Sequence, residues 1–377
     1  MPWQNCKNIL CIRPDNMGDL IMSGPAIRAL KESFDAKITV LTSSMAKGVT
    51  KHIAEIDDVI IYDLPWVKTA AEPDEGTFNA AIADIKSRRF DAAVIFTVYS
   101  QNPLPTAMLA YLAGIRKVLA YCRENPYNLI TNWVPDKEPY ESIKHQVRRD
   151  LDLVATVGAT TTDENLKLII DGGLWRRVCE KLTDLGLKIN KPWLLLHAGV
   201  SEIKRQYPVE NWVEAAMRLI QDFDYQVVLT GSSAEKELTD ELHSMIGAGS
   251  FSAAGIFNLD EFICLVKHAP VMLSVNTGTI HIAAAVGTPV VVLYAQTNPQ
   301  HTPWNVSNKV LPFAVAEHLR SKNEVVAYVN SQVYSQPISM PTAADIIAAV
   351  NDLISLPNSP VPPFHETQNG NRAIAAS

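Results

Sequence analysis

The chain has few cysteines, no surplus of positive charge and no long apolar runs, and each absence excludes a class of protein. Its 377 residues hold five scattered cysteines, without the spacing of a zinc site or a disulfide framework, which favours a reducing cytoplasm. A formal charge of -7 argues against a nucleic-acid partner. The longest apolar runs have the length of strands and the N-terminus does not resemble a signal peptide, so neither a membrane-spanning helix nor a leader is expected.

Motifs of common nucleotide and metal enzymes are also missing. No Gly-x-Gly-x-x-Gly follows the first predicted strand, which argues against a nicotinamide dehydrogenase, and there is no P-loop. An Asp-x-Asp pattern at Asp150 and Asp152 is a candidate for metal-dependent sugar transfer. It lies in a predicted helix, where residues two apart do not face each other, so we expect both on the solvated surface. No metal site is predicted.

The chain does contain a regular alternation of strand-like and helix-like segments. Short, nearly continuous apolar runs are typical of strands that are buried on both faces, and strand–helix alternation predicts a parallel sheet. In the first half, strands are expected at Asn8–Arg13, Lys37–Leu41, Val59–Tyr62, Ala92–Phe96 and Lys117–Tyr121, and helices at Gly18–Phe34, Ala46–Glu55, Phe78–Ser87, Pro105–Ala113 and Lys144–Val157. The Pro- and Asn-rich stretch Arg123–His145 is predicted to be a loop, and Gly158–Lys191 to bridge the halves.

The same alternation restarts in the second half. Strands are expected at Trp193–His197, Gln226–Leu229, Val271–Val275 and Pro289–Leu293, and helices at Val209–Gln221, Ala234–Met245, Leu259–Lys267, Thr279–Val286 and Thr342–Leu353, the last capped by Thr342. The predicted fold class is therefore α/β, with two Rossmann-like doubly wound domains facing across a cleft. We expect domains at 1–170 and 171–340, a C-terminal helix at 341–356 and a disordered tail at 357–377.

The strongest candidate binding segment is the turn after Val271–Val275. Asn276, Thr277 and Gly278 lead from a buried strand into a helix, whose first N–H groups lack intrahelical partners and carry a partial positive charge. Gly278 has no side chain to keep an anion away, and His281 lies on the first helical turn. This arrangement suits a phosphate. On local pattern alone, a plain strand–turn–helix with capping residues is equally compatible.

Two further polar clusters follow predicted strands. The loop after Trp193–His197 carries the adjacent cations Lys204 and Arg205, which suit a ligand phosphate, although a solvated loop would look the same. After the first strand, Asp15 and Asp19 lie at a helix start, where a carboxylate stays ionised. Asp19 is a candidate general base, and helix capping is the competing interpretation for both acids.

Together these segments resemble glycosyltransferase family 9, the heptosyltransferases of lipopolysaccharide core assembly. The matching motifs, in chain order, are Gly18-Asp19 with Ser23-Gly24-Pro25, Arg205-Gln206-Tyr207-Pro208 with Trp212, Thr230-Gly231, Thr277-Gly278 with His281 and Ala283-Ala284, Gly287-Thr288-Pro289, and Thr297, Pro299 and Trp304. The resemblance covers about Asn8 to Trp304. One position departs from it: the family usually has Asp before Thr-Gly, where this chain has Asn276.

The resemblance implies a GT-B fold and an inverting, metal-independent transfer of a sugar from a nucleotide diphosphate donor, ADP-heptose in characterised members. It implies no cofactor beyond this co-substrate, a glycan or lipopolysaccharide-core acceptor, and peripheral contact with the inner membrane face. Asp19 becomes the candidate base, and Arg205, with Lys204 as helper, the group that neutralises the leaving diphosphate. The other implied donor-site residues are Ser201, Gly231, Glu235, Ile256, Phe257, Asn276, Thr277, Gly278 and His281.

Two other functions remain open at this point. Asn276 removes a negative charge near the expected diphosphate, which motivates a nucleotide-sugar binding protein without catalysis. A sugar-nucleotide epimerase or hydrolase of the same architecture is the other alternative. The acceptor side is least defined by sequence. The loop 123–139, with Tyr121, Tyr127 and Trp133 in and beside it, is the candidate there, and surface packing the competing interpretation.

Overall fold

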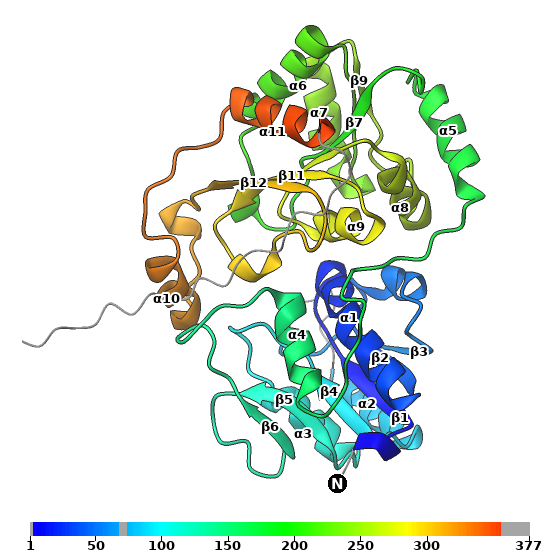
Figure 1. Ribbon diagram of the computed structural model, residues 1–377, viewed down its shortest axis with the longest axis vertical. Coiled ribbons are helices and arrows are strands. Elements are labelled where there is room, and N and C mark those ends of the chain that lie inside the picture. The colour runs from blue at the N-terminus through cyan, green and yellow to red at the C-terminus, as the bar shows by residue number, and fades with distance from the viewer. Residues whose placement is uncertain (1–2, 68–73, 356–377) are drawn as a thin grey trace, which may run out of the picture.

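Two six-stranded parallel sheets organise the chain in a computed structural model, which describes residues 3–67 and 74–355 (Figure 1). The prediction of two doubly wound α/β domains is confirmed. The predicted tail 357–377 lies outside the described residues. No helix among the described residues combines the length and the apolar character needed to cross a bilayer.

The first half contains a sheet of order β3-β2-β1-β4-β5-β6. Its strands are β1 (Asn8–Ile12), β2 (Lys37–Thr42), β3 (Asp58–Ile61), β4 (Ala92–Ile95), β5 (Val118–Cys122) and β6 (Asn132–Pro135). Its helices are α1 (Met17–Phe34), α2 (Glu75–Ser87), α3 (Leu104–Leu112) and α4 (Gln146–Ala155), with a 3-10 helix η2 at Lys47–His52.

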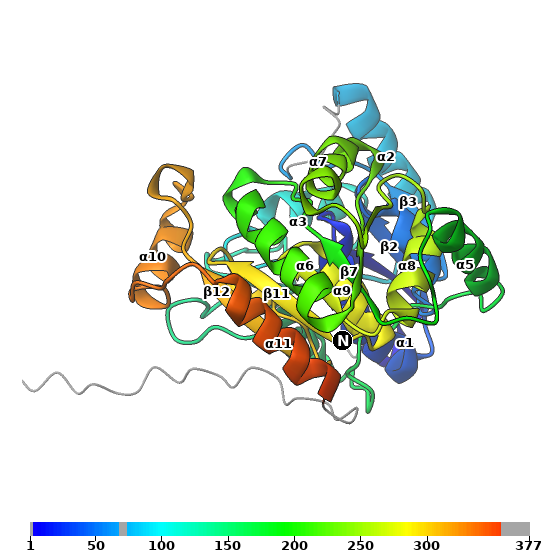
Figure 2. The same ribbon diagram turned by 90° about the horizontal axis from the view of Figure 1, so that it is seen from above.

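The second half contains a sheet of order β12-β11-β10-β7-β8-β9. Its strands are β7 (Trp193–His197), β8 (Gln226–Leu229), β9 (Ser250–Ser252), β10 (Met272–Val275), β11 (Val290–Ala295) and β12 (Asn308–Phe313). Its helices are α5 (Leu174–Asp184), α6 (Val209–Phe223), α7 (Lys236–Ile246), α8 (Leu259–His268), α9 (Gly278–Val286), α10 (Glu324–Gln332) and α11 (Ala343–Ser355). Figure 2 shows α10 and α5 on opposite sides of this half, and α11 packs against α6.

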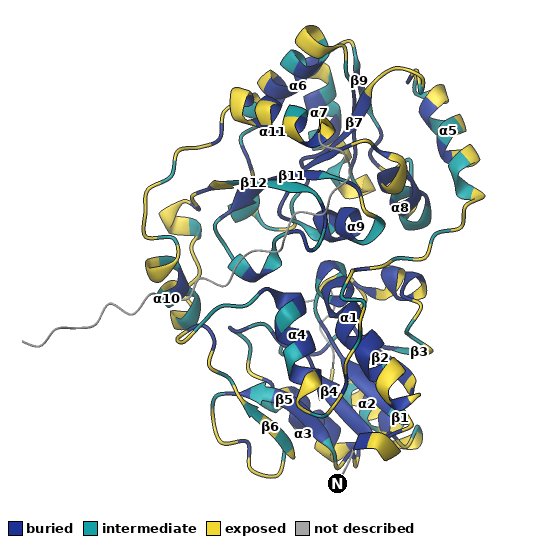
Figure 3. Ribbon diagram, in the orientation of Figure 1, coloured by how far each residue is buried: buried dark blue, intermediate teal, exposed yellow. Residues whose placement is uncertain are grey.

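The central strands are buried on both faces, as their apolar runs predict (Figure 3). In β1, Ile9 and Cys11 belong to one hydrophobic cluster, and Leu10 and Ile12 belong to another. Successive side chains of a strand point to opposite faces, so the two clusters are the two sides of the same sheet. The run therefore contributes to both helical layers that cover the sheet.

The carboxyl edges of the two sheets face each other, and α1 packs against α9 across the junction (Figure 1). On one side, the Gln300 side chain of the second half is fully buried. Its Oε1 accepts from the Tyr99 N–H at 3.4 Å, and its Nε2 donates to the Lys144 carbonyl at 3.1 Å and lies 3.5 Å from both Glu138 oxygens. On the other side, Asp260 contacts Lys51 at 2.7 Å and His52 at 2.9 Å.

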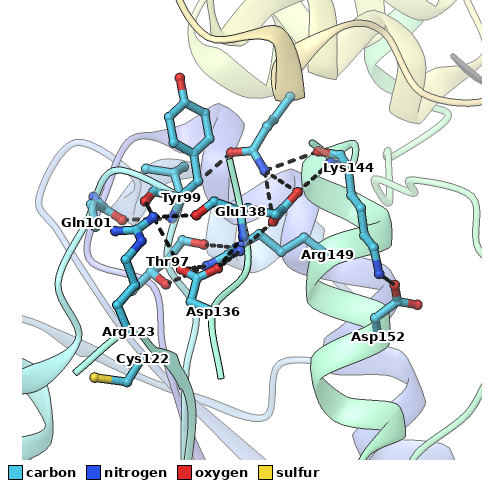
Figure 4. A network of polar contacts seen from close by, with 12 residues as sticks. Thr97, Tyr99, Gln101, Cys122, Arg123, Asp136, Glu138, Lys144, Arg149 and Asp152 are labelled. Atoms are coloured by element: carbon cyan, nitrogen blue, oxygen red, sulfur yellow. Dashed lines mark hydrogen bonds and ion pairs between the residues drawn. The ribbon is translucent and has the colours of Figure 1, made fainter. Parts of the chain in front are cut away.

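Glu138, which Gln300 contacts, belongs to a buried polar network of the first half (Figure 4). The Arg149 guanidinium is 1% exposed, donates twice to Asp136 at 2.9 Å, and contacts Glu138 and the Thr97 carbonyl. Burial raises the pKa of Glu138, and Arg149 opposes this rise. The charges are buried but paired, so the network can anchor the second half without leaving an isolated charge in the interior.

Several local predictions were wrong. The expected helix at 46–55 is the 3-10 helix η2, and the expected loop 123–145 contains β6. The segment expected to bridge the halves, 158–191, contains α5, a helix that was not predicted. β9, β12 and α10 were not predicted. The new strands β6, β9 and β12 are all edge strands. Their sequences, Asn-Trp-Val-Pro, Ser-Phe-Ser and Asn-Lys-Val-Leu-Pro-Phe, contain polar residues or proline, so none is a continuous apolar run. The Thr342 cap is confirmed, since its Oγ1 accepts from the Asp345 N–H at 3.3 Å.

The Asp-x-Asp pair also needs a correction. Its two acids do lie in a helix, α4, but Asp150 is only 1% exposed, so the predicted solvated surface is wrong for it. α4 packs against α1, and Asp150 points into that contact, where it accepts from Ser23 Oγ and from Gln146 Nε2, both at 2.7 Å. Asp152 is part-exposed and pairs with Lys144 at 2.6 Å.

Candidate active site

A cavity of about 560 Å³ lies between the two halves, where the loops at the carboxyl ends of the strands meet. The first half contributes the start of α1, including Asp19. The second half contributes the loops after β7, β8, β10 and β11, including Arg205 and the start of α9. Ligands of doubly wound sheets bind at this edge, so the cavity is the candidate site for substrates.

The start of α9 supplies an anion-binding surface to this cavity. Thr277 is the N-cap, with extended backbone, and α9 begins at Gly278 directly after the buried strand β10. Thr277, Gly278 and His281 all line the cavity. The first N–H groups of a helix have no intrahelical acceptor, and the helix dipole is positive there. The surface therefore suits a phosphate or diphosphate.

The two helix starts approach closely at two glycines. A Cβ built on Gly18 of α1 would lie 3.1 Å from the Gly278 Cα and 2.7 Å from the His281 ring. One on Gly278 would lie 3.4 Å from Met17 and 3.6 Å from the Gly18 nitrogen. Only glycine fits at position 18 without movement of its neighbours. Because Gly18 has no side chain, α1, which carries Asp19, can pack directly against the anion-binding start of α9.

Asp19 is held as an ionised carboxylate at the start of α1. Its Oδ1 accepts from Arg13 Nη2 at 3.0 Å, and its Oδ2 from the Asn16 N–H at 3.2 Å. Burial alone would raise the pKa of Asp19, but the Arg13 cation and the Asn16 hydrogen bond outweigh it, so the pKa lies below its ordinary value. Asp19 thus fills both roles considered from the sequence: it bonds the N-cap residue and it faces the cavity.

Asp15, the other candidate, is in a different position. Its Oδ1 accepts from Gln101 at 2.6 Å, and its Oδ2 lies 3.3 Å from Arg13 Nε. It is not among the described residues that line the cavity. Burial and the neighbouring Asp19 charge raise its pKa. Asp15 therefore orients Arg13, and sequence reasoning missed Arg13 itself, a fully buried cation between two acids.

Arg205 lines the cavity from the second half, and one of its nitrogen atoms has no hydrogen-bond partner among the described residues. Its Nη1 donates to the Asn276 carbonyl at 3.1 Å, and its Nη2 lies 3.2 Å from Glu202. The Arg205 Nε is buried and has no hydrogen-bond partner among the described residues. Ser201 lines the same cavity, whereas Lys204 does not line it and instead contacts Glu202 at 3.3 Å. Of the two adjacent cations, Arg205 is thus the one presented to this cavity.

The side chain of Asn276 is engaged by the neighbouring strand end. Its Nδ2 donates to the Ala295 carbonyl at 3.2 Å and to Thr297 Oγ1 at 3.1 Å, and its Oδ1 accepts from the Ala295 N–H at 3.1 Å. An aspartate could not make the two donations. Asparagine at this position therefore ties the end of β10 to the end of β11, and it also lines the cavity.

Two histidines lie beside Asp19. Burial lowers the pKa of His281 to about 3 and of His301 to about 4, so both rings are neutral at neutral pH. The His281 Nδ1 is buried without a described hydrogen-bond partner, and His301 Nε2 lies 3.7 Å from Asp19 Oδ1. Sequence reasoning missed His301. Its only local signal was a histidine in the loop that carries Thr297 and Pro299.

The cavity also contains most of the remaining residues that the family resemblance implies for the donor site. Gly231, Glu235 and Phe257 line it, whereas Ile256 is not among the described lining residues. The Glu235 carboxylate accepts from the Ser232 N–H at 2.7 Å and lies over Gly199, where a Cβ would be 2.0 Å from it. Of the acceptor candidates, Tyr127 is 81% exposed, and neither it, Tyr121 nor Trp133 lines a described cavity.

Comparison with known proteins identifies the family. The model of glycosyltransferase family 9 (heptosyltransferase) matches residues 80–327, well over half of the chain. The chain therefore belongs to glycosyltransferase family 9. Lipopolysaccharide heptosyltransferase 2 of Escherichia coli K12 is 26% identical over 309 residues, covering 78% of this chain and 84% of that protein.

Solved structures show the same fold. A family 9 glycosyl transferase from Veillonella parvula has a TM-score of 0.73 at 17% identity, covering 92% of this chain and 97% of that one. The E. coli ADP-heptose lps heptosyltransferase II has a TM-score of 0.68 at 21% identity, with coverages of 92% and 98%. The expected GT-B architecture of this glycosyltransferase is confirmed. Among its described residues no group of His, Cys, Asp or Glu could hold a metal ion.

The glycosyltransferase has a second, smaller cavity next to the first. It measures about 310 Å³ and shares Arg205 and Thr297 with the larger cavity. Tyr99 and Ser100 of the first half form one wall. The others come from Lys204, the loop after β11, and the segment 315–330 that includes α10. No sequence motif indicated this cavity.

Proposed function

We propose that this glycosyltransferase moves a heptose-like sugar from a nucleotide diphosphate donor, ADP-heptose in the first instance, to an acceptor of the lipopolysaccharide-core type. One relative is named a lipopolysaccharide heptosyltransferase, and one solved neighbour is named for ADP-heptose. The observation that carries the proposal is the close approach of Gly18 to Gly278, which puts an ionised carboxylate and an anion-binding helix start in one cavity.

The proposed reaction is a single displacement. Asp19 takes the proton of the acceptor hydroxyl while the hydroxyl oxygen bonds to the anomeric carbon of the sugar. The bond from that carbon to the diphosphate oxygen breaks on the opposite face, so the configuration inverts. The carboxylate is suited to this step because its environment favours the charged form before the acceptor arrives.

The leaving diphosphate gains negative charge as its bond to the sugar breaks. Arg205, with its unpartnered Nε, and the N–H groups at the start of α9 are already in place around the position proposed for it. Such preorganised donors stabilise the transition state without reorganisation, and removal of one typically costs on the order of 100-fold in rate. Arg205 and the start of α9 take the neutralising role, and the proposal involves no metal.

The donor-binding residues follow the same geometry. Thr277, Gly278, Ser201 and His281 would contact the diphosphate, and Gly231, Glu235 and Phe257 the nucleoside. His281 can donate only one N–H because it is neutral. Asn276 would support donor binding by joining the ends of β10 and β11, next to the loops that line the cavity.

The test replaces Asp19 by asparagine and measures ADP release and product mass with ADP-heptose and lipopolysaccharide truncated before its heptoses. We expect Asp19→Asn to bind ADP normally but to lose at least roughly 100-fold in transfer rate. Glu32→Gln is the matched control, because Glu32 is an exposed carboxylate on the same helix. Full activity of Asp19→Asn would exclude Asp19 as the base.

The same assay separates the alternatives. Binding of ADP-heptose with no turnover of any acceptor indicates a binding protein, and isomerised or hydrolysed donor without acceptor indicates an epimerase or hydrolase. Retained anomeric configuration in the product, read by NMR, would exclude the single displacement. Loss of transfer in EDTA, restored by a divalent cation, would contradict the metal-independent step.

A further inference from the structure

The smaller cavity differs from the rest of the molecule in its charge. The whole chain has a formal charge of -7. The described residues that line this cavity nevertheless include the three cations Lys204, Arg205 and Arg320 and no acidic side chain. A cavity of one sign of charge attracts ligands of the opposite sign.

The remaining lining suits hydroxyl groups. Ser100, Gln296, Thr297, Asn298 and Asn330 supply hydroxyl and amide groups. The Asn330 Oδ1 is buried and has no hydrogen-bond partner among the described residues. A buried acceptor without a donor is costly unless a ligand supplies one. The cavity thus offers one unused acceptor for a hydroxyl and, beside Arg205, the two cations Lys204 and Arg320 for an anionic group.

The position of the cavity assigns it to the second substrate. The proposed diphosphate residues Thr277 and Gly278 line the larger cavity and not this one. The two cavities meet at Arg205 and Thr297, so a molecule in the smaller one would approach a donor in the larger one from the side of Arg205. Tyr99 and Ser100 belong to the first half, so the cavity is complete only when the two halves are together.

We propose that this cavity is an acceptor subsite, in which Lys204 and Arg320 bind an anionic group, phosphate or carboxylate, on the acceptor glycan. The assignment rests on the proposed function. It moves Lys204 from the donor diphosphate to the acceptor. It also gives the segment around α10 a role, because that segment carries Arg320 and Asn330 into the wall.

The geometry of the two cations supports a binding role. Arg320 donates from Nε to the Val315 carbonyl at 3.2 Å, a contact that holds the guanidinium at the wall. Lys204 is held near the cavity by Glu202 at 3.3 Å, and the same carboxylate contacts Arg205 Nη2 at 3.2 Å. Glu202 therefore spaces the two adjacent cations, which would otherwise repel each other.

The experiment compares Lys204→Gln and Arg320→Gln with Lys322→Gln, a cation two residues from Arg320 that is not among the described lining residues. The substrates are ADP-heptose and the truncated lipopolysaccharide. We expect each lining variant to raise the acceptor KM roughly tenfold or more, as loss of a hydrogen bond to a charged group does. The donor KM, the kcat at saturating acceptor and the thermal midpoint should stay at the wild-type values, and Lys322→Gln should match the wild type throughout.

A second arm identifies the anionic group. One acceptor sample is treated with phosphatase and another is carboxyl-reduced, and each is assayed with the wild type and Arg320→Gln. The treatment that removes the recognised anionic group should raise the acceptor KM of the wild type. The acceptor KM of the wild type and of Arg320→Gln should then be equal. A difference that survives both treatments overturns the proposal, as does an unchanged acceptor KM in both lining variants or a raised donor KM instead.

Failure of this inference differs from failure of the proposed function. A wild type that turns over, with lining variants equal to Lys322→Gln, overturns only the subsite. For a wild type without turnover, calorimetry of the truncated lipopolysaccharide in the presence of ADP decides. Binding that is weaker in Arg320→Gln supports the subsite, and binding equal in both proteins, or absent, overturns it.

Discussion

Replacement of Asp150 by asparagine should stabilise the protein at neutral pH. The carboxyl is buried between α4 and α1, where Ser23 and Gln146 donate to its two oxygens. Burial raises its pKa from 3.8 to about 6, although Arg13 and the two hydrogen bonds oppose the rise. An asparagine fits the same bonds, because its Oδ1 can accept from Gln146 and its Nδ2 can donate to the Ser23 hydroxyl, which in turn donates to the Asp19 carbonyl.

The magnitude follows from the pKa. A raised pKa means that the folded state binds the proton more tightly than the unfolded state, so stability falls as the pH rises between about 4 and about 6. A rise from 3.8 to about 6 corresponds to roughly 3 kcal/mol, at about 1.4 kcal/mol per pKa unit. The wild type carries this cost above pH 6, and Asp150→Asn does not carry it at any pH.

The assay is urea unfolding of both proteins between pH 4 and pH 8. The stability difference in favour of Asp150→Asn should be near zero at pH 4 and grow to at most about 3 kcal/mol at pH 7. Asp152→Asn is the matched control, since Asp152 is part-exposed on the same helix and paired with Lys144. A variant less stable than the wild type at pH 8 would refute the reasoning and show that Asp150 is stabilised as an ion by Arg13.

Three further predictions concern the junction and the base. Gly18→Ala should abolish transfer because its Cβ would meet His281 and the Gly278 backbone, whereas Gly24→Ala on the same helix has open space and should remain active, as assayed by ADP release. Gln300→Leu should lower the free energy of unfolding by about 1–3 kcal/mol, because it leaves the buried Tyr99 N–H without its acceptor and the Lys144 carbonyl without its donor; an unchanged urea midpoint would contradict this. The lowered pKa of Asp19 predicts that kcat/KM stays constant from pH 7 down to about pH 5, because Asp19 remains ionised over this range. A fall in kcat/KM at a pH above about 5 that also occurs in Asp150→Asn would contradict this prediction.

Local sequence was sufficient where a single segment carries the signal. The apolar runs of β1, β7 and β10 predicted buried strands, and the residues after each were expected at one edge of a parallel sheet. The structure places Asp19, Ser201, Arg205, Thr277 and Gly278 in one cavity at that edge. Their roles there stay predictions until the variants are assayed.

The features that the sequence did not reveal depend on contacts between residues that are far apart in the chain. His301 is separated from Asp19 by most of the sequence, and Asp150 is buried only because α4 packs on α1. The short strands β6 and β9 are stabilised by pairing with a neighbour and have no apolar run of their own. The smaller cavity needs residues from both halves.

The sequence by itself determined the alternation of strands and helices, the anion-binding start of α9 and the family motifs, because strand burial, helix capping and glycine turns are properties of neighbouring residues. Only the tertiary structure decided that Arg205 lines the larger cavity while the adjacent Lys204 lines only the smaller one. It also decided that Asp150 is buried while Asp152 is part-exposed. It also showed that Asn276 joins two strand ends. These outcomes depend on distances between segments far apart in the chain, which packing of the two halves sets and local pattern does not encode.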